Sequence, residues 1–215
     1  MKKILIAIPC LGQKVDAYLA HSLCESIKMG ADYGLDINCV FLANESILPM
    51  AKNELFKVAY NDQYDAMVFI EDTLYWDEKT LVDILLSEHD VVTLPVVNKN
   101  DKQESYNVKV DAVTITPHDY FKVKQTDTSF LKLSKKVITD LWNSNAELQF
   151  RGKKIKNICE YGFQNSEFIG EDSVLSTKIK ELGYDILVYP NHTVSRVGYK
   201  LYTGDFDQHI VNEFN

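Results

Sequence analysis

The chain has 215 residues, of which 46% are hydrophobic and 25% are charged, an ordinary composition for a globular protein. This length indicates a single domain with one sizeable core, and the composition excludes long disordered or fibrous segments. The 23 basic and 31 acidic residues give a formal charge of −8, so the chain as a whole is not a basic nucleic-acid binder.

The first 95 residues alternate four times between a short apolar segment and a polar, mostly helix-forming one. The apolar segments, which we predict to be strands, are Ile4–Ile8, Ile37–Leu42, Ala66–Ile70 and Val91–Leu94. We predict helices from Val15 to about Gly30, over Leu48–Tyr60 with Ser46 as N-cap, and over Leu81–Leu86 with Asp77 as N-cap. Such alternation predicts an α/β fold, a mostly parallel sheet with helices on both faces.

The second half of the chain has a different pattern. We predict antiparallel strands over Tyr106–Ile115 and Tyr120–Lys124, helices over Lys135–Trp142 and Gly170–Gly183, and short strands over Ile186–Tyr189 and Thr193–Val197. No linker or repeat separates the halves. We therefore expect one domain over 1–215, with a parallel half (1–97) and a small antiparallel annex (98–215).

No apolar run reaches the roughly 20 residues of a membrane helix, and Ile4–Ile8 is too short for a signal peptide. The four cysteines form no CxxC pair, which favours reduced thiols. We therefore expect no membrane span and a cytoplasmic location.

Ligands of parallel sheets collect where the strands end, and two acids stand at such a point. Glu71 and Asp72 directly follow the apolar segment Ala66–Ile70. Two carboxylates there repel one another unless a cation compensates, and Mg²⁺ with a bound phosphate would do so. The alternative is a solvent-exposed turn that caps a helix.

A second acidic pair, Glu171 and Asp172, opens the last long predicted helix. A carboxylate at a helix N-terminus is stabilised in its charged form, as a general base requires. Simple capping of the helix dipole explains the pair equally well. Lys52 and Asn53 lie on the second predicted helix, from which a cation could reach a diphosphate; the alternative is an ordinary surface lysine.

Several common catalytic and binding motifs are absent. The sequence has no GxGxxG, no GxxxxGK[ST] and no GxSxG, and its five histidines show neither HxH nor HxxxH spacing. These absences disfavour dinucleotide binding, a P-loop nucleotide site, an α/β-hydrolase and a histidine-ligated metal.

Six segments, taken in order, carry a more specific pattern. They are Ile4–Gly12, Leu48–Asn53, Tyr64–Trp76, Asp90–Pro95, Thr126–Lys136 and Gly170–Ile186. Their order and spacing resemble the GT-A type glycosyltransferases, particularly the small family-2-like enzymes common in bacteriophages and bacteria. The resemblance covers roughly residues 3–200. It implies a Rossmann-like GT-A fold whose residues 1–97 bind the donor and whose residues 98–215 bind the acceptor.

The resemblance implies an enzyme that moves a sugar from a nucleotide sugar, such as a UDP sugar, to a hydroxyl group. The donor would be bound by residues that follow the strands or lie on the second helix, namely Pro9, Cys10, Gly12, Asn44, Lys52, Asn53, Glu71 and Asp72, and by Arg196 in the predicted strand Thr193–Val197. Asp172 would deprotonate the acceptor hydroxyl, and Glu171 would orient Asp172 or the acceptor.

The sequence departs from the family pattern where a metal would bind. The family's D-x-D acids align with Glu71 and Thr73, and its H-x-G histidine aligns with Arg196. Two variants stay open: Mg²⁺ or Mn²⁺ held by Glu71 and Asp72, or metal-independent transfer in which Arg196 and Lys52 neutralise the diphosphate. A nucleotide- or glycan-binding module that kept the fold without catalysis is a third. A nucleotidyltransferase would carry a glycine-rich segment after its first strand, where only Gly12 stands.

Charge suggests an acceptor. Between Lys122 and Lys156 lie nine basic and three acidic residues, a net charge of +6 that leaves −14 elsewhere. Phe130, Trp142 and Phe150 are interleaved with these charges, as on nucleic-acid surfaces. The resemblance permits a hydroxymethylated pyrimidine in double-stranded phage DNA, because phage enzymes of this type include ones that glycosylate such bases, and with the basic stretch as support this is the favoured acceptor. A cell-surface glycan, a lipid-linked acceptor or a merely solvated basic face are the alternatives.

Overall fold

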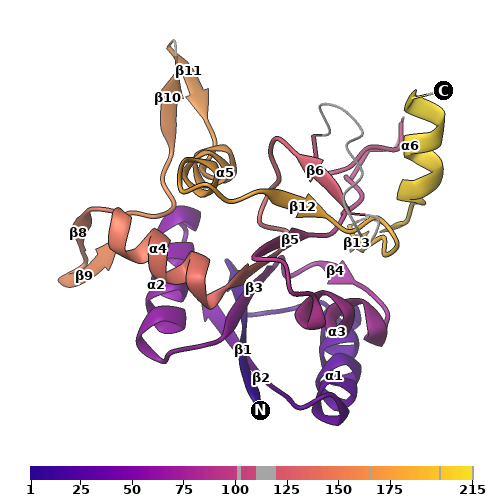
Figure 1. Ribbon diagram of the computed structural model, residues 1–215, viewed down its shortest axis with the longest axis horizontal. Helices are drawn as coiled ribbons and strands as arrows, with labels where there is room; N and C mark the ends of the chain where they lie inside the picture. The colour runs from indigo at the N-terminus through magenta and orange to yellow at the C-terminus, as the bar shows by residue number, and fades with distance from the viewer. Residues whose placement is uncertain (101–102, 110–119, 165, 199, 215) are drawn as a thin grey trace.

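The computed structural model describes the chain except residues 101–102, 110–119, 165, 199 and 215 (Figure 1). Its centre is a seven-stranded sheet. The strands, in spatial order, are β2 (Leu35–Ala43), β1 (Lys2–Cys10), β3 (Ala66–Ile70), β7 (Phe130–Ser134), β5 (Val91–Thr93), β12 (Ile186–Val188) and β6 (Phe121–Val123). The four strands predicted in the first half are confirmed.

Five of the seven strands run in the same direction. β1 is parallel to β2 and β3, and β12 is parallel to β5. β7 and β6 run against them, β7 between β3 and β5 and β6 beside β12. The predicted mostly parallel sheet is confirmed, but β7 was not predicted as a strand. Because β7 is antiparallel, its first residues lie at the edge where the parallel strands end.

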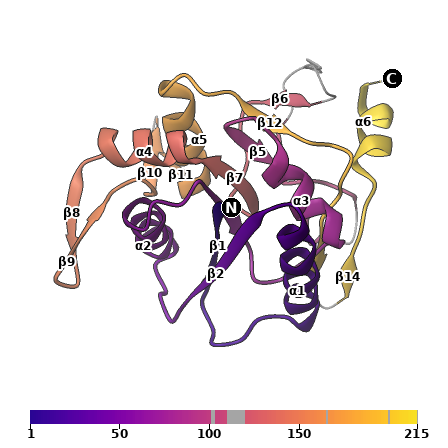
Figure 2. The same ribbon diagram turned by 60° about the horizontal axis from the view of Figure 1, so that its bottom comes forward.

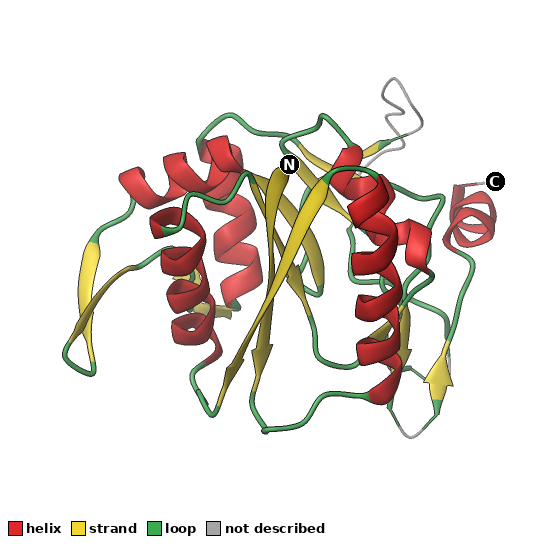
Figure 3. Cartoon of the chain, turned by 90° about the horizontal axis from the view of Figure 1, so that it is seen from below, coloured by secondary structure: helices red, strands yellow, loops and turns green. Residues whose placement is uncertain are grey.

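Helices cover both faces of the sheet, as predicted (Figures 2 and 3). They are α1 (Ala17–Asp32), α2 (Leu48–Asn61), α3 (Glu78–Leu86), α4 (Lys135–Ser144), α5 (Glu171–Glu181) and α6 (Phe206–Phe214). Alternate residues of β1 supply the two cores: Ile4, Ile6 and Ile8 pack with α1 and α3, and Leu5 and Ala7 pack with α2, α4 and α5. Each fully buried aliphatic side chain stabilises this packing by about 1.5–3 kcal/mol.

The helix ends follow the predictions with one exception. The side chain of Asp77 accepts hydrogen bonds from the backbone N–H groups of Lys79 and Thr80, so it caps α3 as predicted. Gly183, with φ of +86°, follows the end of α5. Ser46 was predicted to cap α2, and this is wrong: the N-cap position is Ile47, which makes no side-chain cap.

Besides β6, β7 and β12 of the central sheet, the second half contributes strands to three smaller sheets. They are the hairpins β8–β9 (Glu147–Phe150, Lys153–Lys156) and β10–β11 (Gly162–Gln164, Glu167–Ile169), and the sheet of β14 (Leu201–Tyr202), β13 (Ser195–Val197) and β4 (Leu74–Tyr75). The two hairpins were not predicted, and they project from the helical layer (Figure 1). The predicted strands Tyr120–Lys124 and Thr193–Val197 are confirmed as β6 and β13.

The predicted strand Tyr106–Ile115 lies only partly in the described part of the chain. Tyr106 forms an isolated bridge with Val97, and Lys109 forms one with Gln125; residues 110–115 lie outside the described residues. Among the described helices, none combines the length and the apolar character that a membrane crossing requires.

Candidate functional site

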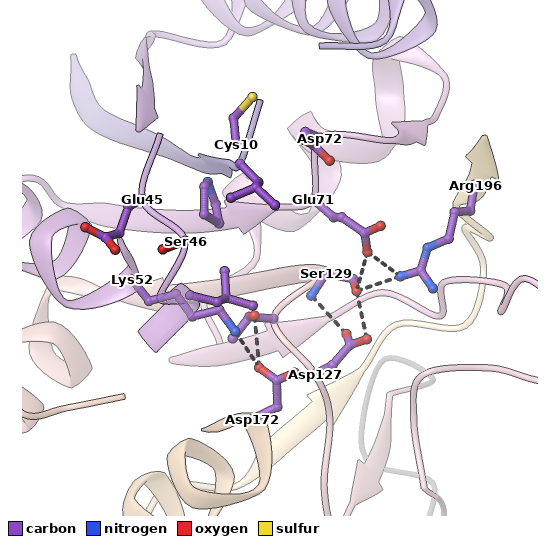
Figure 4. A pocket seen from close by; sticks show the side chains of 14 residues that line it. Cys10, Glu45, Ser46, Lys52, Glu71, Asp72, Asp127, Ser129, Asp172 and Arg196 are labelled. Carbon is purple, nitrogen blue, oxygen red and sulfur yellow. Dashed lines mark hydrogen bonds and ion pairs between the residues drawn. The ribbon is translucent and has the colours of Figure 1, made fainter. Parts of the chain in front are cut away.

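A cavity of about 420 Å³ opens at the edge where β1, β2 and β3 end (Figure 4). This volume is in the usual range for small-molecule sites. Seven of the residues predicted from the sequence line it: Pro9, Cys10, Lys52, Glu71, Asp72, Asp172 and Arg196. Residues from both halves of the chain therefore meet in one cavity.

Four predicted site residues do not line this cavity. The side chain of Asn53 is fully buried and binds the backbone of Ile158 and Cys159, so its assignment to donor binding is corrected to a structural role. Gly12 and Asn44 lie in the loops beside the cavity, outside its lining. Glu171, also outside the lining, is 8% exposed and bonded to Lys52.

One end of the cavity is formed by the Lys52 site, which consists of Lys52, Glu171, Asp172 and Thr128. Nζ of Lys52, a residue 2% exposed, lies 3.1 Å from Oε1 of Glu171 and 2.8 Å from Oδ1 of Asp172. Burial lowers the pKa of Lys52, but Asp172 and Glu171 outweigh it, and the pKa is raised. Lys52 is thus committed to two carboxylates, which corrects the expectation that it reaches a diphosphate.

The carboxylate of Asp172 is held at one oxygen and open at the other. Its Oδ1 accepts hydrogen bonds from Nζ of Lys52 and, at 3.0 Å, from Oγ1 of Thr128. No group among the described residues donates to Oδ2, and the side chain is 29% exposed. Asp172 lies in the first turn of α5, where the helix dipole favours negative charge. The arrangement fits an ionised carboxylate with one oxygen ready to accept a proton.

The other end is the Arg196 site, which consists of Arg196, Glu71, Ser129 and Asp127. Strand β13 pairs with β4, setting Arg196 opposite Leu74 and close to the end of β3. Nη2 of Arg196 lies 2.7 Å from Oε2 of Glu71 and 2.7 Å from Oγ of Ser129. The Ser129 hydroxyl also bonds Oδ2 of Asp127 at 2.7 Å.

Burial raises the pKa of Asp127, although hydrogen bonds from Asn107 and Ser129 oppose this. The pKa of Asp72 is also raised, by burial first; a hydrogen bond with the Cys10 thiol opposes this, and the charge of Glu71 adds to it. These shifts mark the cavity as a place where carboxylates are crowded and withdrawn from water.

Sequence reasoning missed Asp127, Thr128 and Ser129 as site residues. They form the segment before β7, and they reach the cavity because β7 runs against its neighbours. Three polar residues directly before the short segment Phe130–Leu133, which is apolar except for Lys132, were a visible sign. This sign places the three residues at the cavity only if β7 is known to be an antiparallel strand in the middle of the sheet. Glu45, which follows β2 and also lines the cavity, was missed as well.

Glu71 and Asp72 do not fit a divalent cation. Both oxygens of Glu71 are occupied, Oε1 by the hydroxyl of Thr73 and Oε2 by Arg196 and Ser129. The side chains of Glu71 and Asp72 point in different directions (Figure 4). Among the described residues, no three His, Cys, Asp or Glu side chains gather, so a divalent cation here would depend on Glu71 and Asp72 alone and on phosphate oxygens of a substrate. The predicted metal pair is therefore corrected: the cation beside Glu71 is Arg196.

The basic stretch Lys122–Lys156 does not form one continuous surface. Lys132 is 2% exposed inside β7, and its Nζ donates to the carbonyl oxygens of Ser87 and His89. Burial lowers its pKa to about 8. The ion pairs of the exposed residues are Lys122–Asp185, Arg151–Glu45, Lys153–Glu54 and Lys154–Glu147.

The aromatic residues of that stretch are also largely committed to the fold. Phe130 is fully buried, and Trp142 stacks on Tyr60 with ring centroids 4.8 Å apart. Phe150, on β8, lies under the guanidinium of Arg151 at 4.9 Å. Of these three aromatic residues, Phe150 is therefore the one whose ring contacts an exposed basic side chain, that of Arg151.

No protein-family model and no curated protein sequence matches the chain. Among solved structures it is similar to A197 from STIV, with a TM-score of 0.56 and 12% identity over 92% of this chain and 86% of that one. It is also similar to S. aureus TarS 1–349, with a TM-score of 0.50 and 16% identity over 90% of this chain. The match spans 60% of that TarS fragment. The same fragment in complex with UDP-GlcNAc gives a TM-score of 0.49, with 14% identity over 90% of this chain.

At 12–16% identity these likenesses bear on the fold alone. The chain has a mixed α/β fold similar to GT-A glycosyltransferase structures, as the sequence predicted.

Proposed function

We propose that the chain is a glycosyltransferase that moves a sugar from a nucleotide-sugar donor to a hydroxyl group. The observation that carries this proposal is Asp172, an acid with one oxygen fixed and one open, in a cavity at the carboxyl edge of a GT-A-like sheet. Nucleotides bind at this edge in open α/β sheets generally.

In the proposed reaction, Oδ2 of Asp172 takes the proton of an acceptor hydroxyl, and the acceptor oxygen attacks the anomeric carbon of the donor sugar. The bond from that carbon to the phosphate oxygen breaks, and its electron pair leaves with the nucleoside diphosphate. Oδ1 stays bonded to Lys52 and Thr128, which fixes the direction of the carboxylate. The proton on Asp172 then passes to water.

The donor would lie along the strand ends. The backbone at Pro9 and Cys10 and the loop at Glu45 and Ser46 border the cavity on the side of β1 and β2. We assign them to the nucleoside, which leaves the sugar between Asp172 and the end of β3.

The test is release of nucleotide from a mixture of UDP, GDP, CDP, ADP and dTDP sugars, with stabilisation against heat as a second readout. A donor at 100 times its dissociation constant adds about 2.7 kcal/mol to the free energy of unfolding, which is readily seen. Slow release by the wild type, lost in Asp172→Asn, supports the proposal. Stabilisation without any release would instead indicate a binding module that lacks catalysis.

For the acceptor we propose a hydroxymethylated pyrimidine in double-stranded DNA. The supporting observation is the β8–β9 hairpin, whose turn residue Arg151 pairs with Glu45 at the cavity, 2.7 Å away. Lys153 and Lys154 follow on the same hairpin, with side chains 65% and 70% exposed. Basic residues beside the cavity can contact the phosphates of a duplex whose base is turned toward Asp172.

This acceptor is tested by the salt dependence of binding to a duplex that contains 5-hydroxymethylcytosine. Lys153→Glu with Lys154→Glu should weaken binding and flatten the log–log salt slope by about 0.9 per lost phosphate contact. Lys122→Glu, on β6 at the far edge of the sheet, is the matched control. A wild-type protein without salt-dependent DNA binding would rule this acceptor out and favour a glycan or lipid-linked one.

A further inference from the structure

We propose, building on the function above, that Arg196 takes the place of a divalent cation and binds the diphosphate of the donor directly. Glu71 and Ser129 hold the guanidinium in position, and no metal ion is needed for donor binding. Glu71 and Asp72 do not fit a divalent cation, so the positive charge opposite the diphosphate would come from Arg196.

The first observation is the place of Arg196. The residue lines the cavity although its side chain is only 9% exposed, so its charge is held inside the site. The pairing of β13 with β4 brings it to Glu71, which directly follows β3. Residues that follow a parallel strand of such a sheet are where phosphates are usually bound.

The second observation is that the guanidinium has unused donors. Nη2 alone has acceptors, on Glu71 and Ser129, among the described residues. Nε is buried and has no acceptor in the part of the chain that the structure describes. A buried donor without a partner is costly, and such groups in native proteins call for an explanation. The planar fork of arginine matches two phosphate oxygens at once, which explains why donors would be kept in reserve here.

The third observation is the different state of the other cation in the cavity. Nζ of Lys52 already contacts the carboxylates of both Glu171 and Asp172. Arg196 contacts one carboxylate, Glu71, whose side chain is 34% exposed. A diphosphate that enters the cavity can therefore bind Arg196 beside Glu71 or in its place. Either way, no second buried carboxylate loses its cation.

The arrangement also suits the chemistry. As the bond to the sugar breaks, an additional negative charge develops on the diphosphate, and a fixed guanidinium stabilises that charge. Thr128 bonds Asp172 while its neighbour Ser129 bonds Arg196, so one short segment sets the distance between the base and the leaving group.

The experiment measures the affinity of the wild type for UDP, GDP, CDP, ADP and dTDP in EDTA and again in Mn²⁺. We expect the bound nucleotide to have the same affinity within about twofold in both conditions. Arg196→Met should weaken it by about 10- to 100-fold, the usual effect of hydrogen bonds to a charged group. Arg196→Lys, which keeps the charge without the fork, should fall between. Lys122→Met, which removes an exposed cation on β6, is the matched control and should bind like the wild type.

The outcomes separate the two proposals. Binding that needs Mn²⁺ or Mg²⁺ overturns the role of Arg196 and leaves the transferase proposal intact. Binding in EDTA that Arg196→Lys and Arg196→Met leave unchanged also overturns it. No binding of any diphosphate with or without metal overturns both proposals. If Arg196→Met does not fold, the chelator measurement on the wild type and the lysine variant still decide.

Discussion

The Lys52 site and the Arg196 site resemble one another in composition and differ in what is left open. Each places a buried cation against a carboxylate at the carboxyl edge of the sheet, and the consecutive residues Thr128 and Ser129 join them. At the Lys52 site the cation is paired with two carboxylates, and an acid oxygen, Oδ2 of Asp172, is open. At the Arg196 site both oxygens of Glu71 accept hydrogen bonds, and Nε of the cation has no acceptor among the described residues. The first arrangement suits a base, and the second suits the binding of an anion.

The choice of cation fits this difference. A lysine ammonium is a compact charge that can hold two carboxylates, whereas an arginine guanidinium can hold one acid and still offer further donors in a fixed plane. The comparison therefore predicts that damage at one site affects the rate of transfer, and damage at the other affects the affinity for the donor.

The largest effect should follow from removing the base. Asp172→Asn should slow transfer by about 10²- to 10⁴-fold, because the amide cannot accept the proton. Donor affinity should change little, since the proposed position of the diphosphate is at the Arg196 site. The rate and the donor dissociation constant are measured side by side, with Asp185→Asn, an exposed partner of Lys122, as control. Turnover that survives in Asp172→Asn would remove Asp172 from the mechanism.

Breaking the Lys52 site should cost stability as well. Lys52→Met leaves Glu171 and Asp172 without their cation, and loss of one partner of a buried ion pair costs about 3–5 kcal/mol of unfolding free energy. Lys153→Met breaks an exposed contact with Glu54 and should cost at most about 1 kcal/mol. Urea unfolding of both variants checks this. Equal stabilities would contradict the view of Lys52 as a buried, committed cation.

Lys132 sharpens the comparison because it is as buried as Lys52 but has carbonyl oxygens as partners. Its pKa is lowered to about 8 mainly by burial, whereas the acids raise that of Lys52. Between about pH 8 and 10.4 the unfolded chain binds more protons at Lys132 than the folded one, so this residue makes unfolding harder as pH rises.

The corresponding measurement is urea unfolding of the wild type and Lys132→Met at pH 7 and pH 9.5. The wild type should gain about 1–2 kcal/mol relative to the variant over this interval. Comparing the two proteins cancels the contributions of other groups that titrate in the same range. A constant difference between them would mean that Lys132 keeps an ordinary pKa.

The smallest effects should come from the two linking hydroxyls. Thr128→Val removes a hydrogen bond to Asp172 and should slow transfer about tenfold at saturating donor. Ser129→Ala removes a hydrogen bond to Arg196 and should weaken donor binding about tenfold while sparing the saturated rate. Kinetics over a range of donor concentrations separate the two effects. If both variants change the same parameter, the two sites are one functional unit.

Local patterns in the sequence determined the elements and part of the site. Runs such as Ile4–Ile8 and Ala66–Ile70 are strands because their apolar, β-branched residues suit a buried sheet. Asp77 caps α3 because its side chain can accept hydrogen bonds from backbone N–H groups only two and three residues further along the chain. The same reasoning located Glu71, Asp72 and Asp172 near the ends of elements, which is where they line the cavity.

Which of these residues meet was decided by the tertiary structure. Arg196 and Glu71 are 125 positions apart, and Lys52 and Asp172 are 120 apart. The order and direction of strands set these contacts, and hydrophobic periodicity carries no information about either. The unpredicted strand β7 is the clearest case: its antiparallel course brings Asp127–Ser129 to the cavity and buries Lys132 in the sheet. A strand of either direction has the same alternation of side chains, so the sequence alone leaves the partners of these polar groups open until the chain is folded.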